Sequence, residues 1–122
     1  MPLPLYYLCL QTNMDLVDYQ TAALHTAVYP NQGANFAYPA LGLAGESGEV
    51  ADKLKKVIRD NDGVLTDSVR DAVAKELGDV LWYVAVLAHE LGYDLNTIAK
   101  NNIDKLASRM ERGVLTGSGD NR

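Results

Sequence analysis

The stretch "GLAGESGEVADKLKK" (42–56) decides the fold, because it reads as a helix that carries acids on its apolar side. At about 100° per residue, one side of this helix is apolar, and its members are Leu43, Val50 and Leu54. Glu46 falls about 60° from the centre of that side, and Glu49 lies at its flank. A charged side chain in a core is costly unless it is paired or binds a metal. These acids therefore need a partner elsewhere in the chain.

A second helix repeats the arrangement in "KELGDV" (75–80). Its apolar side is marked by Val73, Val80 and Leu91. Glu76 lies about 40° from the centre of that side, and Asp79 lies at its edge. Tyr83 follows one turn after Asp79 on the same side. Two helices thus each carry a carboxylate pair at i, i+3, and in each pair the first acid points inward.

An alternative is that these acids lie on helix surfaces in ordinary i, i+4 ion pairs. Glu49 with Lys53, and Lys75 with Asp79, have the required spacing. The alternative explains Glu46 and Glu76 poorly, because neither has a basic residue three or four positions away.

If the two helices pack together, their four carboxylates converge and repel one another unless cations lie between them. Ligation by carboxylate oxygens alone favours a hard cation, Mg²⁺ or Mn²⁺, over zinc. A di-iron bundle is the rival, but it needs Glu-x-x-His. Neither His25 nor His89 follows a glutamate at that spacing.

The rest of the chain predicts a small all-α bundle of four helices. Pro and Gly in "YPNQGAN" (29–35), the turn residues of "DNDGVLTD" (60–67) and Gly92 separate the helical patterns. Either Thr66 or Asp67 is expected to cap the third helix, and Asp94 the fourth. The expected helices are 14–28, 38–59, 67–91 and 94–112. The expected organisation is a peripheral N-terminal arm (1–13), a helical domain (14–113) and a flexible polar tail (114–122).

The segment "DVLWYVAVLAHEL" (79–91) is apolar nearly all round. Such a helix is buried on several sides, which four short helices in one subunit hardly achieve. Leu81, Trp82 and Val86 are therefore expected to face away from the subunit's own core. This predicts a homo-oligomer in which Trp82 lies at the interface.

Size, charge and cysteine content bound the function. A chain of 122 residues with 48% hydrophobic residues is long enough for one core. A net charge of −5 argues against a nucleic-acid or anionic-membrane surface. The opening segment is too short for a membrane span and lacks the basic start of a signal peptide. One cysteine, Cys9, cannot form an intrachain disulfide, so a reducing, cytoplasmic location is expected.

The fourth helix supplies the opposite charge. Asn102 and Arg109 project near the middle of its apolar side, and Lys105 lies at the border. Lysine and arginine at such positions can snorkel to solvent. Taken with the acids, they predict a wall of phosphate-binding cations opposite a wall of metal-binding carboxylates. Lys53 and Lys56, on the second helix, are expected to be solvated.

With these residues in view, the sequence resembles the MazG-type all-α nucleotide pyrophosphohydrolases. The family's hallmark is E-x-x-E followed by E-x-x-D on the next long helix, here "ESGE" (46–49) and "ELGD" (76–79). The resemblance extends to "ELGDVLWYV" (76–84) and "NIDKLASRMERG" (102–113), and it covers residues 14–113. Asn102 and Lys105 supply the N-x-x-K that follows in order.

The resemblance implies Mg²⁺-dependent hydrolysis of a nucleoside or deoxynucleoside triphosphate to the monophosphate and pyrophosphate, with Mn²⁺ as a substitute. The acids would hold the metal, which lowers the pKa of a water that attacks the α-phosphorus; they are Glu46, Glu49, Glu76 and Asp79. Glu49 would orient that water. Lys105 and Arg109 would hold the leaving pyrophosphate, and Tyr83 and Asn102 would contact the sugar or the phosphates.

Similar proteins assemble as dimers or dimers of dimers, with active sites near the interface. Their roles are house-cleaning or nucleotide-pool control. Two alternatives remain: a specialised phosphoribosyl-ATP pyrophosphohydrolase, and a helical interaction module without catalysis.

The nucleobase is expected to meet the segment "YPNQGANFAY" (29–38), which offers the aromatic rings of Tyr29, Phe36 and Tyr38. Each of these rings is equally well explained by packing within the loop. No residue of the sequence indicates whether the site would bind a pyrimidine or a purine base.

Overall fold

The computed structural model describes residues 13–122, which form four helices and no strand. The helices are α2 (Leu16–Leu24), α3 (Ala37–Asp60), α4 (Asp67–Glu90) and α5 (Leu95–Glu111). This confirms the all-α prediction. The predicted N-terminal arm, apart from Asn13, lies outside the described residues. Within 13–122, no helix combines the length and the apolar character that a membrane crossing requires.

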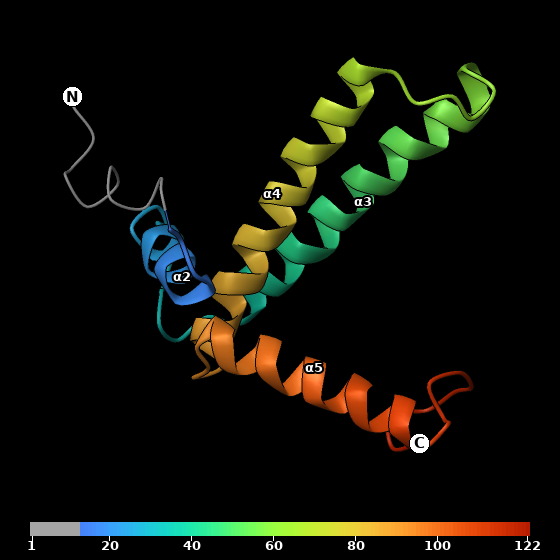
Figure 1. The fold of residues 1–122 in the computed structure, drawn as a ribbon. Helices are drawn as coiled ribbons and strands as arrows, with labels where there is room; N and C mark the ends of the chain where they lie inside the picture. Colours follow the sequence, from blue (N-terminus) through green and yellow to red (C-terminus); the bar gives the residue numbers. More distant parts are fainter. Residues whose placement is uncertain (1–12) are drawn as a thin grey trace.

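The two longest helices, α3 and α4, form an antiparallel hairpin, which Figure 1 shows from its side. Each helix has 24 residues. In the loop between them, Gly63 takes φ +76° and its N–H donates to the Val57 carbonyl at 3.1 Å. Thr66 then caps α4, its hydroxyl accepting from the N–H of Val69 at 3.3 Å. Because the helices run in opposite directions, residues at similar distances from this loop lie at the same level.

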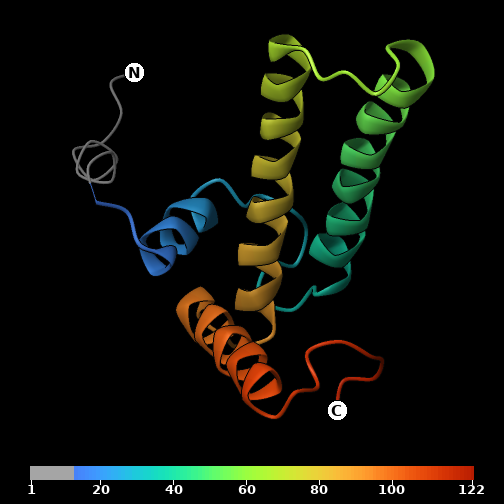
Figure 2. The same ribbon diagram turned by 45° about the vertical axis from the view of Figure 1, so that its right-hand side comes forward.

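The core lies at the other end of the hairpin, where α2 and α5 pack against the C-terminal half of α4 (Figure 2). Its buried residues are mostly small, which allows the helices to approach closely. The first cluster consists of Ala23, Ala85, Ala88 and Leu95, and the second of Ala27, Tyr29 and Val86.

This core corrects the prediction about the apolar segment of α4. Val86 is fully buried within its own chain, and Trp82 packs against both core clusters. Neither side chain faces away from the subunit's core, because α2 and the segment after it cover that side of α4. Leu81 alone of the three is exposed. A Trp82→Glu substitution would therefore damage the core and does not test an interface.

The first helix is shorter than predicted. A capping box at Asp15 and Asp18 starts it, and it ends at Leu24 with His25 as the C-cap. The chain then turns, so that Ala27 and Tyr29 enter the core while Val28 is 90% exposed. The predicted helix over 14–28 therefore extends too far at its C-terminal end.

A buried glutamine, Gln20, joins three elements of the fold. Its side-chain N–H groups donate to the carbonyls of Ala85 at 3.0 Å and Tyr93 at 3.1 Å. Its side-chain oxygen accepts from the N–H of Leu95 at 3.0 Å, the first residue of α5. The N–H groups of a helix's first turn have no intrahelical partner. Gln20 thus satisfies one of them and fixes where α5 leaves α4.

Replacing Gln20 with Met should lower the free energy of unfolding by about 1–3 kcal/mol, because buried backbone groups lose their partners while the volume is kept. Urea unfolding followed by circular dichroism measures this. Gln32→Met, at an exposed loop position, is the control and should change little. Equal effects of the two substitutions would contradict the role of Gln20.

Candidate functional site

Three carboxylates meet between α3 and α4. They belong to Glu46 on α3 and to Glu76 and Asp79 on α4, and one oxygen from each lies within 4.8 Å of the others. The i, i+3 spacing puts the two α4 acids on one face, and the antiparallel hairpin brings Glu46 to their level. Glu46 and Glu76 are half-buried, whereas Asp79 is exposed. The structure thus brings together three of the four acids singled out in the sequence.

The cluster is electrostatically unfavourable without a cation. The pKa of Glu46 is raised, first by burial, then by a hydrogen bond with the Glu76 side chain and by the charges of Asp79, Glu76 and Glu49. Glu49 itself is exposed and outside the three-carboxylate group, yet it is near enough to act on Glu46. Like charges that raise each other's pKa favour binding of a positive ion between them.

The donor set fits a divalent cation with oxygen ligands. Mg²⁺ binds oxygens at about 2.0–2.1 Å, so two ligands on opposite sides of it stand about 4 Å apart. The observed separation of up to 4.8 Å needs only small side-chain movements to reach that geometry. The exposure of Asp79 leaves room for waters or a substrate oxygen, which Mg²⁺ usually retains.

A cavity of about 290 Å³ opens beside the acids and is lined by Thr26, Glu46, Asp79, Trp82 and Tyr83. The Trp82 indole N–H donates to the Thr26 hydroxyl at 2.8 Å, which fixes the ring at the cavity wall. The rings of Trp82 and Tyr83 meet edge to face at 4.9 Å. Trp82 was not predicted from the sequence as a site residue, although its position three residues after Asp79 places it near the same side of α4.

Tyr83 reaches the site because position 42 is glycine. A Cβ at Gly42 would lie 2.1 Å from the Tyr83 ring, far inside van der Waals contact. The absent side chain therefore lets the ring pack directly on α3, one turn before Glu46. Burial raises the pKa of Tyr83, and the charges of Tyr38, Glu46 and Asp79 raise it further. The phenol consequently stays protonated beside the acids.

The segment before α3 is held by Glu90, a residue that the sequence analysis did not single out. One Glu90 oxygen accepts from the Tyr29 hydroxyl and from the N–H of Gly33 at 2.9 Å. The other accepts from the N–H of Asn35 at 3.2 Å. A carboxylate at the end of α4 thus organises a loop whose own backbone would otherwise lack partners.

This loop determines where the three aromatic candidates for base contact lie. Tyr29 is buried, and its ring stacks on Tyr38 with centroids 4.8 Å apart. Phe36 is exposed at the start of α3. Packing within the loop therefore accounts for one face of Tyr38 and for all of Tyr29.

The residues of α5 that were predicted to bind phosphate lie away from the three carboxylates within one chain. Asn102 and Lys105 are exposed and line a separate cavity of about 430 Å³ with Leu91, Tyr93 and Ile98. Figure 2 shows α5 diverging from the α3–α4 hairpin. Arg109 is 5% exposed and donates to the carbonyl of Asp120 at 2.7 Å, so it ties the C-terminal segment to α5. Within one chain, none of these groups faces the carboxylates across a shared cavity.

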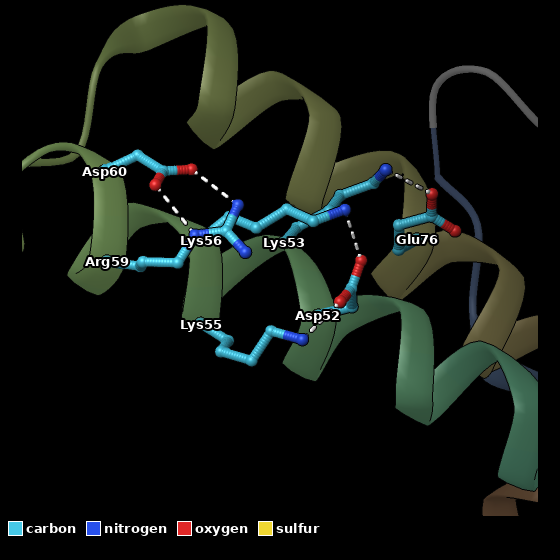
Figure 3. A network of polar contacts seen from close by, with 7 residues as sticks. All are labelled: Asp52, Lys53, Lys55, Lys56, Arg59, Asp60 and Glu76. Atoms are coloured by element: carbon cyan, nitrogen blue, oxygen red, sulfur yellow. Dashed lines mark hydrogen bonds and ion pairs between the residues drawn. The ribbon is translucent and has the colours of Figure 1, made fainter.

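The environment of Lys53 differs from the sequence prediction that this side chain is solvated. Lys53 is not a free surface lysine, because its Nζ lies 3.2 Å from an oxygen of Glu76 on the opposite helix (Figure 3). Lys56, in contrast, pairs within α3 with Asp52 and is largely exposed, as expected.

A cavity of about 550 Å³, larger than the one beside the acids, lies nearer the loop end of the hairpin, between Val57 and Val69. It holds Asp60 but none of the three clustered carboxylates. Chemistry rather than size therefore selects the smaller cavity as the candidate site.

Comparisons with known proteins found a family model and a relative. Residues 38–114 match the family model described as the MazG nucleotide pyrophosphohydrolase domain. The match includes α3 from Tyr38 onward, all of α4 and α5, and all four acids. The Gene 37 protein of Mycobacterium phage L5 is 51% identical over 109 residues, which cover 85% of this chain and 96% of that protein. No solved structure matches the chain.

The Gly42 contact predicts opposite effects at two glycines of α3. Gly42→Ala should destabilise the protein by about 1–3 kcal/mol, because the new methyl group displaces the Tyr83 ring. Gly45→Ala meets no atom within 4 Å and should stabilise by up to about 1 kcal/mol through helix propensity. Urea unfolding of both variants measures the difference. Equal stabilisation by both would show that the close approach is absent.

Glu90 predicts a pH dependence of stability. Its pKa is lowered from 4.5, chiefly by the hydrogen bond from Tyr29 and then by the N–H of Gly33. A carboxyl with a lowered folded-state pKa stabilises the fold fully above 4.5, and this contribution is lost as pH falls through the folded-state value.

Glu90→Gln should therefore be less stable than the wild type at pH 7, and the difference should shrink below pH 4.5. Unfolding midpoints of both proteins between pH 7 and pH 3 measure it. A difference that stays constant over this range would contradict the assigned role of the Glu90 carboxylate.

Proposed function

Because the chain belongs to the MazG nucleotide pyrophosphohydrolase family, we propose that it hydrolyses nucleoside or deoxynucleoside triphosphates to the monophosphate and pyrophosphate. One observation carries the proposal beyond family membership. Carboxylates from two helices converge within 4.8 Å, at the edge of a cavity that has aromatic walls. A binding scaffold without catalysis gains nothing from that repulsion.

The carboxylates of the cluster have separate roles. Glu46, Glu76 and Asp79 hold Mg²⁺, for which Mn²⁺ is a substitute. When bound, the metal neutralises phosphate charge and lowers the pKa of a water. Glu49 is exposed beside the cluster but outside it, so its carboxylate is free to accept a proton from that water and orient it toward the α-phosphorus.

The cavity beside the acids receives the nucleoside. Trp82 and Tyr83 offer an aromatic wall, and Thr26 holds the indole in place. A volume of about 290 Å³ suits a sugar and part of a base. Phe36 and Tyr38 remain candidates for contact with the outer part of the base, since both are exposed.

The cations of α5 are proposed to bind the phosphates from a second copy of the chain. Lys105 and Asn102 are exposed, and neither of them lines the cavity beside the acids in its own chain. A homo-oligomer is supported by large apolar side chains left exposed on the hairpin. They include Leu41 at 74%, Ile58 at 73% and Leu77 at 53% exposure. Arg109 holds the C-terminal segment in this structure, so its contribution to phosphate binding is indirect.

The chain's one cysteine supports a reducing, cytoplasmic location, and membership of the family supports a role in house-cleaning or nucleotide-pool control. The nucleobase that the protein prefers is to be determined by experiment. A panel of nucleotides that includes phosphoribosyl-ATP, with pyrophosphate detection, separates a general pyrophosphohydrolase from the specialised alternative.

Glu46→Gln and Glu76→Gln should each lower Mg²⁺-dependent pyrophosphate release by about 100-fold or more, because a metal ligand is lost. Circular dichroism should show an unchanged helical fold in both variants. Metal-free stability should rise in Glu46→Gln as repulsion is relieved, whereas Glu76→Gln also loses its ion pair with Lys53. Asp71→Asn, an exposed acid on α4, is the control and should keep wild-type turnover. Wild-type turnover in both glutamine variants would refute the assignment.

A further inference from the structure

The ion pair between Lys53 and Glu76 differs from the others in the described part of the chain. It joins α3 to α4, whereas the other ion pairs stay within one helix. Its side chains are 34% and 19% exposed, so it is more sheltered from solvent than those pairs. Figure 3 shows Lys53 crossing to Glu76 while Lys55 and Lys56 turn back to Asp52.

The partner of Lys53 is itself one of the three clustered carboxylates. The ammonium therefore supplies a positive charge at the edge of a site where three acids repel one another. It also pairs with one oxygen of Glu76, the carboxylate that a metal between the helices would bind. A divalent cation that approaches the cluster meets both an occupied carboxylate and a positive charge.

We propose that Lys53 is the resident counter-cation of the metal-free site, and that it competes with the divalent metal for Glu76. The inference rests on the proposed function, because it takes the carboxylates as metal ligands. Lys53 thereby weakens metal binding in the absence of nucleotide. A triphosphate that arrives with the metal offers the displaced ammonium a new anionic partner, so metal and nucleotide bind more readily together than separately.

Experiment distinguishes this competition from the opposite role, in which Lys53 assists metal binding. If Lys53 instead holds Glu76 in the orientation that the metal requires, its removal weakens metal binding. Competition predicts the reverse sign.

The test is Mn²⁺ binding to the full chain without nucleotide, measured by titration calorimetry at fixed pH and ionic strength. Lys53→Met should bind Mn²⁺ about two- to fivefold more tightly than the wild type, the range for loss of one partly exposed ion pair. Lys56→Met removes the same charge from the same helix but not from Glu76, and should bind like the wild type. Lys53→Arg keeps the charge and should restore wild-type affinity.

Unfolding in EDTA gives a second readout. Lys53→Met should unfold at lower urea than Lys56→Met, because the repulsion among the acids is no longer offset. If Lys53→Met does not fold without metal, Lys53→Gln replaces it in the titration, with the same expected increase in affinity.

Two outcomes overturn the inference in distinguishable ways. If the wild type binds Mn²⁺ and releases pyrophosphate but Lys53→Met binds with equal or lower affinity, competition is wrong and the proposed function stands. If neither the wild type nor Lys53→Met binds Mn²⁺, with or without nucleotide, the metal centre of the proposed function fails and the inference fails with it.

Discussion

Repulsion among the carboxylates between α3 and α4 is the constraint on which the rest of the structure depends. Three acids share one small region, and the pKa of Glu46 is raised first by burial and then by its hydrogen bond with Glu76 and the neighbouring negative charges. Holding them there requires helices that approach closely, and the glycine at 42 allows this by admitting the Tyr83 ring. It also requires positive charge, which Lys53 supplies from the opposite helix. In the proposed function this cluster holds a cation, and the remaining fold must offset the cost of keeping the acids together.

The fold offsets this cost with a small core and a few buried polar anchors. Alanines dominate the first core cluster, so the area of apolar surface removed from water is modest. Gln20 compensates by joining α2, α4 and the start of α5 through three hydrogen bonds. Glu90 does the same for the loop before α3. Both anchors lie at the core end of the hairpin, away from its projecting loop end.

The sequence predicted most of the helix positions and the inward direction of the first acid in each pair, because both follow from local patterns. Caps at Thr66 and Asp94 and the i, i+3 spacing of the acids depend only on neighbouring residues. Contacts between helices were harder to predict from the sequence. Lys53 pairs with Glu76 because of the register between α3 and α4 that the loop sets. In the sequence, Glu49 is the nearer candidate, since it stands at i, i+4 to Lys53 on the same helix. Helical periodicity alone does not choose between those two.

The apolar segment of α4 shows the same limit. A helix that is apolar nearly all round must be covered, but its sequence does not say by what. In the structure, α2 and the turn after it cover Val86 and Trp82, and Thr26 accepts the indole hydrogen bond. The burial of Val86 was therefore predictable, whereas the identity of its neighbours was not.

The central claim is that Glu46, Glu76 and Asp79 hold one divalent metal centre. Anomalous diffraction from a crystal soaked in Mn²⁺ tests it most directly. The account predicts an anomalous peak at about 2.1–2.3 Å from an oxygen of each of these three carboxylates, with solvent completing the coordination. A peak elsewhere in the molecule, or none between α3 and α4, would contradict it.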